Sequence, residues 1–172
     1  MFDHFLKIDG IEGESVHAGY RGAIELESFT WGEQQGPGRV ELRDVEFTAQ
    51  VSRASPRLLR ACASGEHFDK AEIQCAPQTS GSPTVFRLIF TGVLVAAYEV
   101  NGRLSGPPVE RVRLLYGKVE CEYRMRRADG SLGEAIRGGF DAIGNQPLPP
   151  APQPVRRSAG RGRRGKPAQA QG

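Results

Sequence analysis

The sequence lacks an apolar run of the roughly 20 residues that a membrane span needs, so we expect no membrane insertion. Its first residues have neither the basic start nor the apolar stretch of a signal peptide, and we expect no secretory leader. Only three cysteines are present, Cys62, Cys75 and Cys121, without CxxC spacing. An odd number of distant cysteines indicates reduced thiols in a cytosolic protein rather than a disulfide framework.

Acidic residues are absent after position 145, whereas the whole chain of 172 residues has 20 acidic and 23 basic side chains. Six basic residues lie in the acid-free part: Arg156, Arg157, Arg161, Arg163, Arg164 and Lys166. Residues 1–145 therefore have 17 basic and 20 acidic side chains, a net charge of −3, and the remainder carries +6. We predict one folded domain over 1–145 and a disordered tail over 146–172, which is Pro-rich and then Arg-Gly-rich.

The basic tail leaves two interpretations open. Its six basic side chains could contact a polyanion through counterion release, or they could form a solvated appendage without a partner. The tail has no aromatic residue that would stack on a base. We therefore treat nucleic acid as an unlikely partner and keep the six residues as candidate polyanion contacts.

Apolar and polar residues alternate along most of the first 145 positions, which is typical of half-buried strands. We expect strands near 3–9, 22–32, 40–51, 69–76, 84–100 and 109–126, with a weaker one near 136–143. The alternation changes phase near Arg43–Asp44 and at Gly117, which predicts a bulge at each position. Gly10 and Gly13 are expected to supply the positive φ of a tight turn after the first strand.

One short helix is predicted between the third and fourth strands. Ser55 is a good N-cap, Pro56 suits the first helical position and Gly65 suits the residue after the last turn. The strand at 85–98 is apolar on both faces, so the helix would cover its outer face. Together these patterns predict a mainly β fold, an antiparallel β-barrel or folded-over sheet with one short α-helix, followed by the tail.

No pattern of chemistry-bearing residues predicts an enzyme, a metal site or a cofactor. His17, His67 and the cysteines lack metal-ligand spacing, and no Gly-rich loop has the Lys-Ser/Thr pair that binds phosphate. Cys62 lies near His67 in sequence, but it falls on the apolar helix face and is expected to be a core residue. Glu120 and Glu122 are expected to form cross-strand ion pairs on a solvated face.

Seven segments carry a family resemblance that runs in order over residues 1–145: 5–15, Phe29-Thr30-Trp31-Gly32, 45–48, 55–67, 119–123, 128–131 and 138–141. Together they resemble the hemolysin-coregulated protein (Hcp) family, the inner-tube component of bacterial type VI secretion. Residues 5–15 resemble the opening of that family, and Phe29-Thr30-Trp31-Gly32 resembles its aromatic-hydroxyl-Trp-Gly strand end. The loop at 32–38 is shorter than in many members, and the tail lies outside the resemblance.

The resemblance implies a β-barrel subunit of a homohexameric ring. Rings would stack into a tube that sheath proteins drive out of the cell behind a spike protein, and the lumen would hold secreted effectors. The protein would then lie in the bacterial cytoplasm before firing and be secreted through the type VI apparatus. The family also implies that the hydroxyl of Thr30 faces the channel and contacts cargo. Side chains alternate along a strand, so Trp31 points the opposite way from Thr30 and is expected to pack into the barrel.

Three other functions stay open at this point. A phage-type tail-tube protein would have the same fold and assembly. A nucleic-acid-binding β-barrel with a basic tail would need exposed aromatic residues on one strand face, and Phe29 and Trp31 stand nearly alone. A sugar-binding or hydrolytic barrel would need several exposed aromatic residues or a carboxylate pair in a cleft, and the sequence indicates neither.

Overall fold

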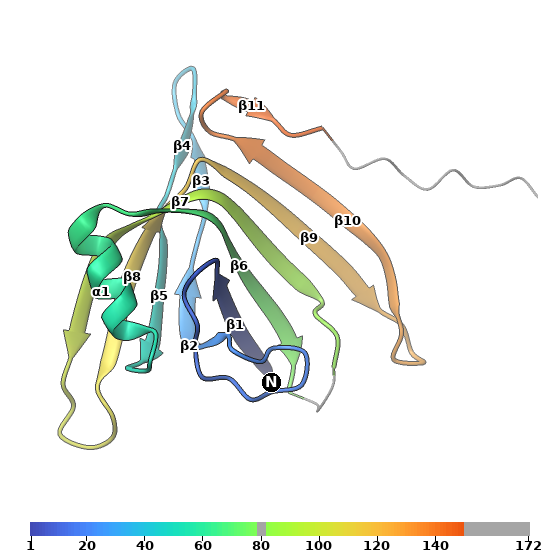
Figure 1. The fold of residues 1–172 in the computed structure, drawn as a ribbon. Helices are drawn as coiled ribbons and strands as arrows, with labels where there is room; N and C mark the ends of the chain where they lie inside the picture. Colours follow the sequence, from blue (N-terminus) through green and yellow to red (C-terminus); the bar gives the residue numbers. More distant parts are fainter. Residues whose placement is uncertain (79–81, 150–172) are drawn as a thin grey trace, which may run out of the picture.

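The computed structural model describes residues 1–78 and 82–149 and shows a β-barrel with further strands attached on one side (Figure 1). The elements in chain order are β1 (Phe2–Ile8), β2 (Ile24–Thr30), β3 (Glu33–Gln35), β4 (Val40–Leu42), β5 (Val45–Gln50), α1 (Ser55–Ser64), β6 (His67–Pro77), β7 (Phe86–Asn101), β8 (Val109–Leu115), β9 (Lys118–Arg126), β10 (Leu132–Asp141) and β11 (Gln146–Pro147). In the described part of the chain no helix is long and apolar enough to cross a membrane.

Six strands close the barrel in the order β1, β2, β5, β8, β7 and β6, with β6 returning to β1. Every neighbouring pair is antiparallel. The short helix α1 lies against β7, the long strand that was expected to need a cover. The predicted fold class, an antiparallel β-barrel with one short helix, is therefore confirmed.

The strand β7 pairs with two different strands along the edge opposite β6. Its second half pairs with β8 and its first half pairs with β9, which continues into β10 and β11. We call β9, β10 and β11 the wing, because they extend away from the closed barrel in Figure 1. Gly92 lies between the two halves of β7 with φ of 66°, a backbone conformation that residues other than glycine rarely adopt.

The predicted bulge at Gly117 is wrong, although a break does occur there. Leu94 pairs with Leu115 on one side of the break and Thr91 pairs with Lys118 on the other, so both strands advance by the same number of residues. A bulge would add a residue to one strand only. Instead β8 ends at Leu115 and β9 begins at Lys118, while β7 continues through Gly92 with a positive φ, and the sheet folds over between Gly92 and Gly117.

The phase change at Arg43–Asp44 does coincide with a register shift. Thr30 pairs with Glu46 and Glu33 pairs with Leu42, so the strand at 40–51 has one extra residue between the two pairs. The expected strand is accordingly divided into β4 and β5, and the expected loop at 32–38 begins a hairpin of β3 and β4. The weak strand expected near 136–143 is a full strand, β10.

Two local predictions need correction. Gly10 has the expected positive φ of 80°, but Gly13 does not. Gly13 is required for another reason, because a Cβ there would lie 2.3 Å from the carbonyl oxygen of Ala23. The N-cap of α1 is Ala54 rather than Ser55, and it makes no side-chain capping bond. The Oγ of Ser55 instead accepts a hydrogen bond from the amide of Ser52 at 2.9 Å, which fixes the turn before the helix.

Apolar side chains from all six barrel strands and from α1 fill the interior. The largest include Leu6, Phe47, Leu58, Ile73, Phe90 and Leu114, which are almost completely buried. A second, smaller cluster lies outside the barrel wall, where Phe5 stacks on Tyr20 with ring centroids 4.1 Å apart. The loop at 9–23 thus covers the outer face of β1.

The sheet continues past the predicted domain boundary at 145. Gln146 and Pro147 pair with Asp141 and Phe140, and the amide of Leu148 donates to the carbonyl of Gly139 at 2.9 Å. The start of the predicted tail therefore belongs to the wing. Residues 150–172, including the six basic candidate residues, lie outside the described residues, and the division into domain and tail stays a prediction.

A carboxyl group is buried inside the barrel. Glu110 is 0 % exposed and points inward from β8, in phase with Val112 and Leu114. Neither carboxyl oxygen has a hydrogen-bond partner of good geometry among the described residues. Burial raises the pKa of Glu110 above its usual value of 4.5, and the hydroxyls of Ser55 and Tyr98 only partly oppose that shift. The barrel therefore favours the protonated, neutral carboxyl.

We predict that Glu110→Gln increases the stability of the barrel at neutral pH relative to the wild type. The pKa of this carboxyl is higher in the folded protein than its usual value of 4.5. Its contribution to the free energy of unfolding is therefore fully present below pH 4.5 and is lost as the pH rises through the pKa of the folded state. The loss is at most about 1.4 kcal/mol per pH unit. Urea unfolding between about pH 4 and about pH 8 should show the difference between the two proteins growing with pH.

Glu120→Gln on β9 is the matched control, because Glu120 is exposed. It should leave the pH dependence of unfolding unchanged. Parallel stability curves for the wild type and Glu110→Gln would contradict a neutral buried carboxyl.

Candidate functional site

Thr30, the residue implied to face a channel, is the last residue of β2 and has an exposed side chain. Its neighbours point the other way and pack against the core. Phe29 meets His4 edge to face at 5.3 Å, and the indole N–H of Trp31 donates to the hydroxyl of Tyr116 at 2.8 Å. The alternation of side chains along a strand therefore separates the polar Thr30 from its two aromatic neighbours.

Thr30 belongs to a polar surface on the outside of β2, β5 and β8, which we call the polar wall. In register, Thr30, Glu46 and Arg113 form one row, and Ser28, Thr48 and Arg111 form the next. The hydroxyls of Ser28 and Thr48 are 2.7 Å apart. Arg111 pairs with Glu46 at 3.5 Å and Arg113 with Asp44 at 3.3 Å, with both pairs partly exposed. The polar wall is hydrophilic and nearly balanced in charge.

The position of Phe29 and Trp31 bears on the nucleic-acid alternative. Base stacking needs aromatic faces that are accessible to solvent, whereas these two rings pack against the interior and the Trp31 ring lies 6.2 Å from that of Phe90. The two residues therefore do not form an exposed stacking platform.

The structure brings together one cysteine and one histidine that are distant in sequence. The Nδ1 of His4 lies 3.3 Å from the Sγ of Cys75. Burial raises the pKa of Cys75 to about 11, so the group is a thiol at neutral pH rather than the thiolate that acts as a nucleophile. Cys62, the cysteine considered from sequence, packs against the core as expected.

The carboxylate of Glu122 is ion-paired as expected, but it is buried rather than solvated. Burial by itself raises the pKa of Glu122, yet hydrogen bonds from Arg124 at 2.9 Å and Arg137 at 2.6 Å outweigh it and lower the pKa below the usual value. Glu122 is therefore held ionised and acts as a cross-strand link. Within residues 1–78 and 82–149 no three His, Cys, Asp or Glu side chains are grouped as metal ligands.

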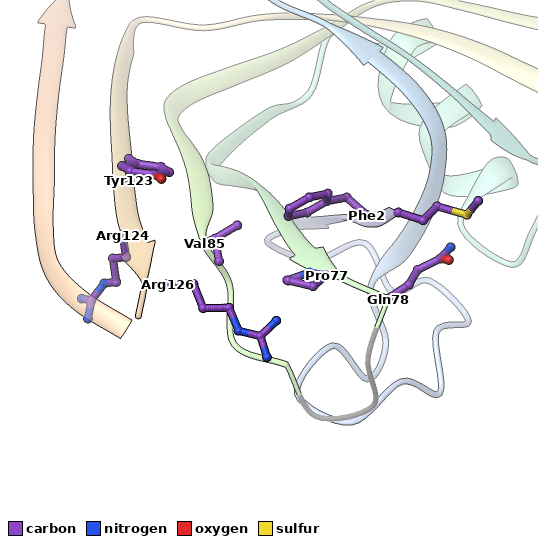
Figure 2. A pocket seen from close by; sticks show the side chains of 8 residues that line it. Phe2, Pro77, Gln78, Val85, Tyr123, Arg124 and Arg126 are labelled. Carbon is purple, nitrogen blue, oxygen red and sulfur yellow. The ribbon is translucent and has the colours of Figure 1, made fainter. Parts of the chain in front are cut away.

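A second candidate surface lies between the C-terminal end of β9 and the ends of β1, β6 and β7 nearest to it. Figure 2 shows the lining of an open hollow of about 520 Å³, with Phe2 and Tyr123 on two sides and Pro77 and Val85 between them. Met1, Gln78, Arg124 and Arg126 complete the lining. We call these eight residues the apolar hollow. Sequence reasoning did not find it, because its residues come from segments that only the fold brings together.

The alternation pattern contained one signal for Glu110 that sequence reasoning missed. Glu110 shares its phase with Val112 and Leu114, so an acidic residue occupies an inward position. No comparable signal marks the polar wall as a functional surface, because polar residues at outward positions are usual on any barrel. The six basic residues of the predicted tail lie outside the described part of the chain, so their role as polyanion contacts stays a prediction.

Comparison with known proteins gives consistent matches. The family model described as type VI secretion system effector, Hcp, matches residues 5–123. The protein hcp1 of Pseudomonas aeruginosa is 31 % identical, over 81 % of this chain and 94 % of its own length. The crystal structure of Hcp1 from Salmonella typhimurium is 31 % identical with a TM-score of 0.74, covering 86 % of this chain and 100 % of that one. A structure described as a type six secretion system protein has a TM-score of 0.80 at 26 % identity, with the same coverage.

Proposed function

This chain belongs to the Hcp family of type VI secretion, and from that premise we propose that it is the structural subunit of the secretion tube. In this proposal six copies close into a ring and the rings stack. The tube carries effector proteins in its lumen and is expelled from the cell, in contact with a spike protein at its tip and sheath proteins around it. The subunit is in the bacterial cytoplasm before firing and acts without catalysis.

The observation that carries the proposal is the open wing. The apolar face of β9 and β10 is continuous with the interior of the barrel but extends beyond it, with Tyr123 46 % exposed, Met125 61 % exposed and Ile136 69 % exposed. A soluble subunit with such a surface favours association. A ring needs two different faces on each subunit, and the wing supplies an apolar face on one side of the barrel.

The polar wall suits the lining of a transport channel. It presents the hydroxyls of Thr30, Ser28 and Thr48 with paired charges, so a cargo protein would meet a hydrated surface of low net charge. We propose that this wall faces the lumen. In that position Thr30 would contact cargo without contributing to the barrel core.

The first prediction from this function concerns assembly. Light scattering on the purified full chain should give a mass of about six subunits, because the exposed apolar wing is covered only when copies associate. Measurements across protein concentration should show the mass persisting on dilution. A monodisperse monomer at high concentration and low salt would contradict the ring.

The second prediction concerns the lumen. Thr30→Gln should reduce by about tenfold the amount of protein that co-purifies with the tagged ring. A tenfold reduction corresponds to a loss of about 1.4 kcal/mol of binding free energy between cargo and ring. Because the side chain of Thr30 is exposed, the variant should form the ring and melt at the same temperature as the wild type. Thr30→Ser keeps the hydroxyl and serves as the control. Unchanged co-purification with the Gln variant would exclude a cargo contact at this position.

The third prediction concerns the basic tail, which we propose contacts an acidic partner. Six copies would bring about 36 positive charges to one ring, so binding to heparin should be strong at low salt and weak at high salt. Deleting residues 150–172, or replacing the six basic residues by Gln, should abolish heparin binding and leave the ring intact. Equal heparin binding by the full chain and both variants would show that the tail has no such role.

A further inference from the structure

A buried cluster of one carboxyl and two hydroxyl groups joins the start of α1 to the barrel wall. Glu110 on β8 is 0 % exposed, and Ser55, the first residue of α1, is 4 % exposed. The hydroxyls of Ser55 and of the half-buried Tyr98 on β7 both lie close enough to Glu110 to act on its pKa. We call these three residues the carboxyl cluster. It belongs to neither the polar wall nor the apolar hollow.

The carboxyl of Glu110 has few hydrogen-bond donors around it. A carboxylate can accept about four hydrogen bonds, whereas only two hydroxyls reach this one, and among the described residues neither of its oxygens has a partner of good geometry. The Oγ of Ser55 already accepts a hydrogen bond from the amide of Ser52 at 2.9 Å, so its own proton is free for Glu110. This environment suits a neutral carboxyl and penalises an ionised one.

The charged side chains on the elements around Glu110 lie outside and are occupied there. Opposite Glu110 on β5 is the small apolar Ala49. Burial and the two hydroxyls are the influences on the pKa of Glu110, and no charged group of the described residues adds to them. Arg53 pairs with Glu12 at 3.6 Å, Arg57 with Glu66 at 2.5 Å and Arg111 with Glu46 at 3.5 Å, and Arg60 and Glu99 are exposed. An ionised Glu110 would therefore need water.

Water reaches Glu110 at the lowest cost if the start of α1 moves. The strand β8 is hydrogen-bonded to β5 on one edge and to β7 on the other, so parting the strands would break ladder bonds. The ladder region ends where the amide of Val51 donates to the carbonyl of Pro108 at 3.1 Å. Beyond it, α1 is attached through the apolar side chains of Ala54, Leu58 and Ala61, and its N-cap makes no side-chain bond. Segments attached in this way open locally before strands do.

From this geometry we propose that the carboxyl cluster is a proton-controlled lock between the barrel and the start of α1. With Glu110 protonated, the lock is closed and α1 stays on the barrel. When Glu110 releases its proton to solvent, the buried negative charge favours an open state in which residues 52–60 move away and water reaches the carboxylate. The lock is a property of the single subunit and goes beyond the proposed tube function, which does not use it.

The lock weakens as the pH rises. In the open state the carboxyl is hydrated and its pKa returns towards 4.5, whereas in the closed state burial holds the pKa above that value. The closed state is therefore fully favoured below pH 4.5 and loses stability as the pH rises through the pKa of the closed state. The ratio of open to closed molecules then grows by at most about tenfold per pH unit.

Hydrogen–deuterium exchange of the full chain, followed by mass spectrometry, tests the lock. After correction for the intrinsic pH dependence of exchange, the protection of residues 52–60 should fall between about pH 5.5 and about pH 8.5, by up to about tenfold per pH unit. The amides of β6 need global unfolding to exchange, so they should stay more protected than residues 52–60 at every pH. Equal protection of the two segments would overturn a local lock.

Three variants identify the titrating group. Glu110→Gln should make the protection of residues 52–60 independent of pH and higher than in the wild type at the alkaline end. Tyr98→Phe removes a donor that favours the ionised carboxyl, so the fall should extend to higher pH. Glu66→Gln is the matched control, because its hydrogen bond with Arg57 lowers the pKa of Glu66 and keeps that group ionised over this range. It should reduce protection of α1 equally at every pH.

Two results would overturn the proposal. Protection of residues 52–60 that does not change with pH in the wild type would exclude a lock. A wild-type pH dependence that persists in Glu110→Gln would exclude Glu110 as the group that operates it. If Glu110→Gln does not fold, an unshifted pH dependence in Tyr98→Phe would overturn the proposal in its place. Each of these results leaves the proposed tube function intact, because assembly does not depend on the lock.

Discussion

The paired interruption at Gly92 and Gly117 is the constraint on which the rest of the structure depends. Leu94 pairs with Leu115 and Thr91 pairs with Lys118, so the register is kept across it. On one side β8 ends at Leu115 and β9 begins at Lys118, while on the other side β7 continues through Gly92. Gly92 has a positive φ there, and the amide of Gly117 donates to the carbonyl of Thr91 at 2.9 Å. Because the sheet folds at this line, β8 reaches β5 and closes the barrel while β9 continues outward.

This fold produces two surfaces of opposite character from one sheet. On the closed side, inward apolar residues are covered and the outward residues of β2, β5 and β8 form the polar wall. On the open side, the same inward phase continues along the wing without a cover. A subunit that assembles needs such a difference, because a face whose apolar side chains are already buried within the subunit gains little free energy from association. The polar wall and the apolar hollow therefore support one proposal, a tube subunit with a hydrated channel.

Sequence reasoning predicted the parts of the fold that follow from local rules. Alternation located nearly all of the longer strands, and Pro56 and Gly65 bounded the helix. Both phase changes were located correctly, but only the one at Arg43–Asp44 involves a register shift. A bulge and a paired break invert the alternation in the same way, so residue order alone does not distinguish them.

The candidate site was predicted in part. The exposure of Thr30 follows from its place between two aromatic residues, because strand geometry alternates the side chains. The apolar hollow could not be predicted, since Phe2, Val85 and Tyr123 meet only through the pairing of distant strands. The same is true of the His4–Cys75 contact. Glu110 was predictable from its phase with Val112, but its neighbours Ser55 and Tyr98 come from distant segments that only the fold brings to it.

The measurement that tests the central claim most directly is a cryo-electron microscopy reconstruction of the purified full chain. The account predicts closed rings of six subunits in which a neighbour covers Phe2 and Tyr123 of each subunit and Thr30 lines the lumen. Single subunits, or rings in which the apolar face of the wing stays open to solvent, would contradict it.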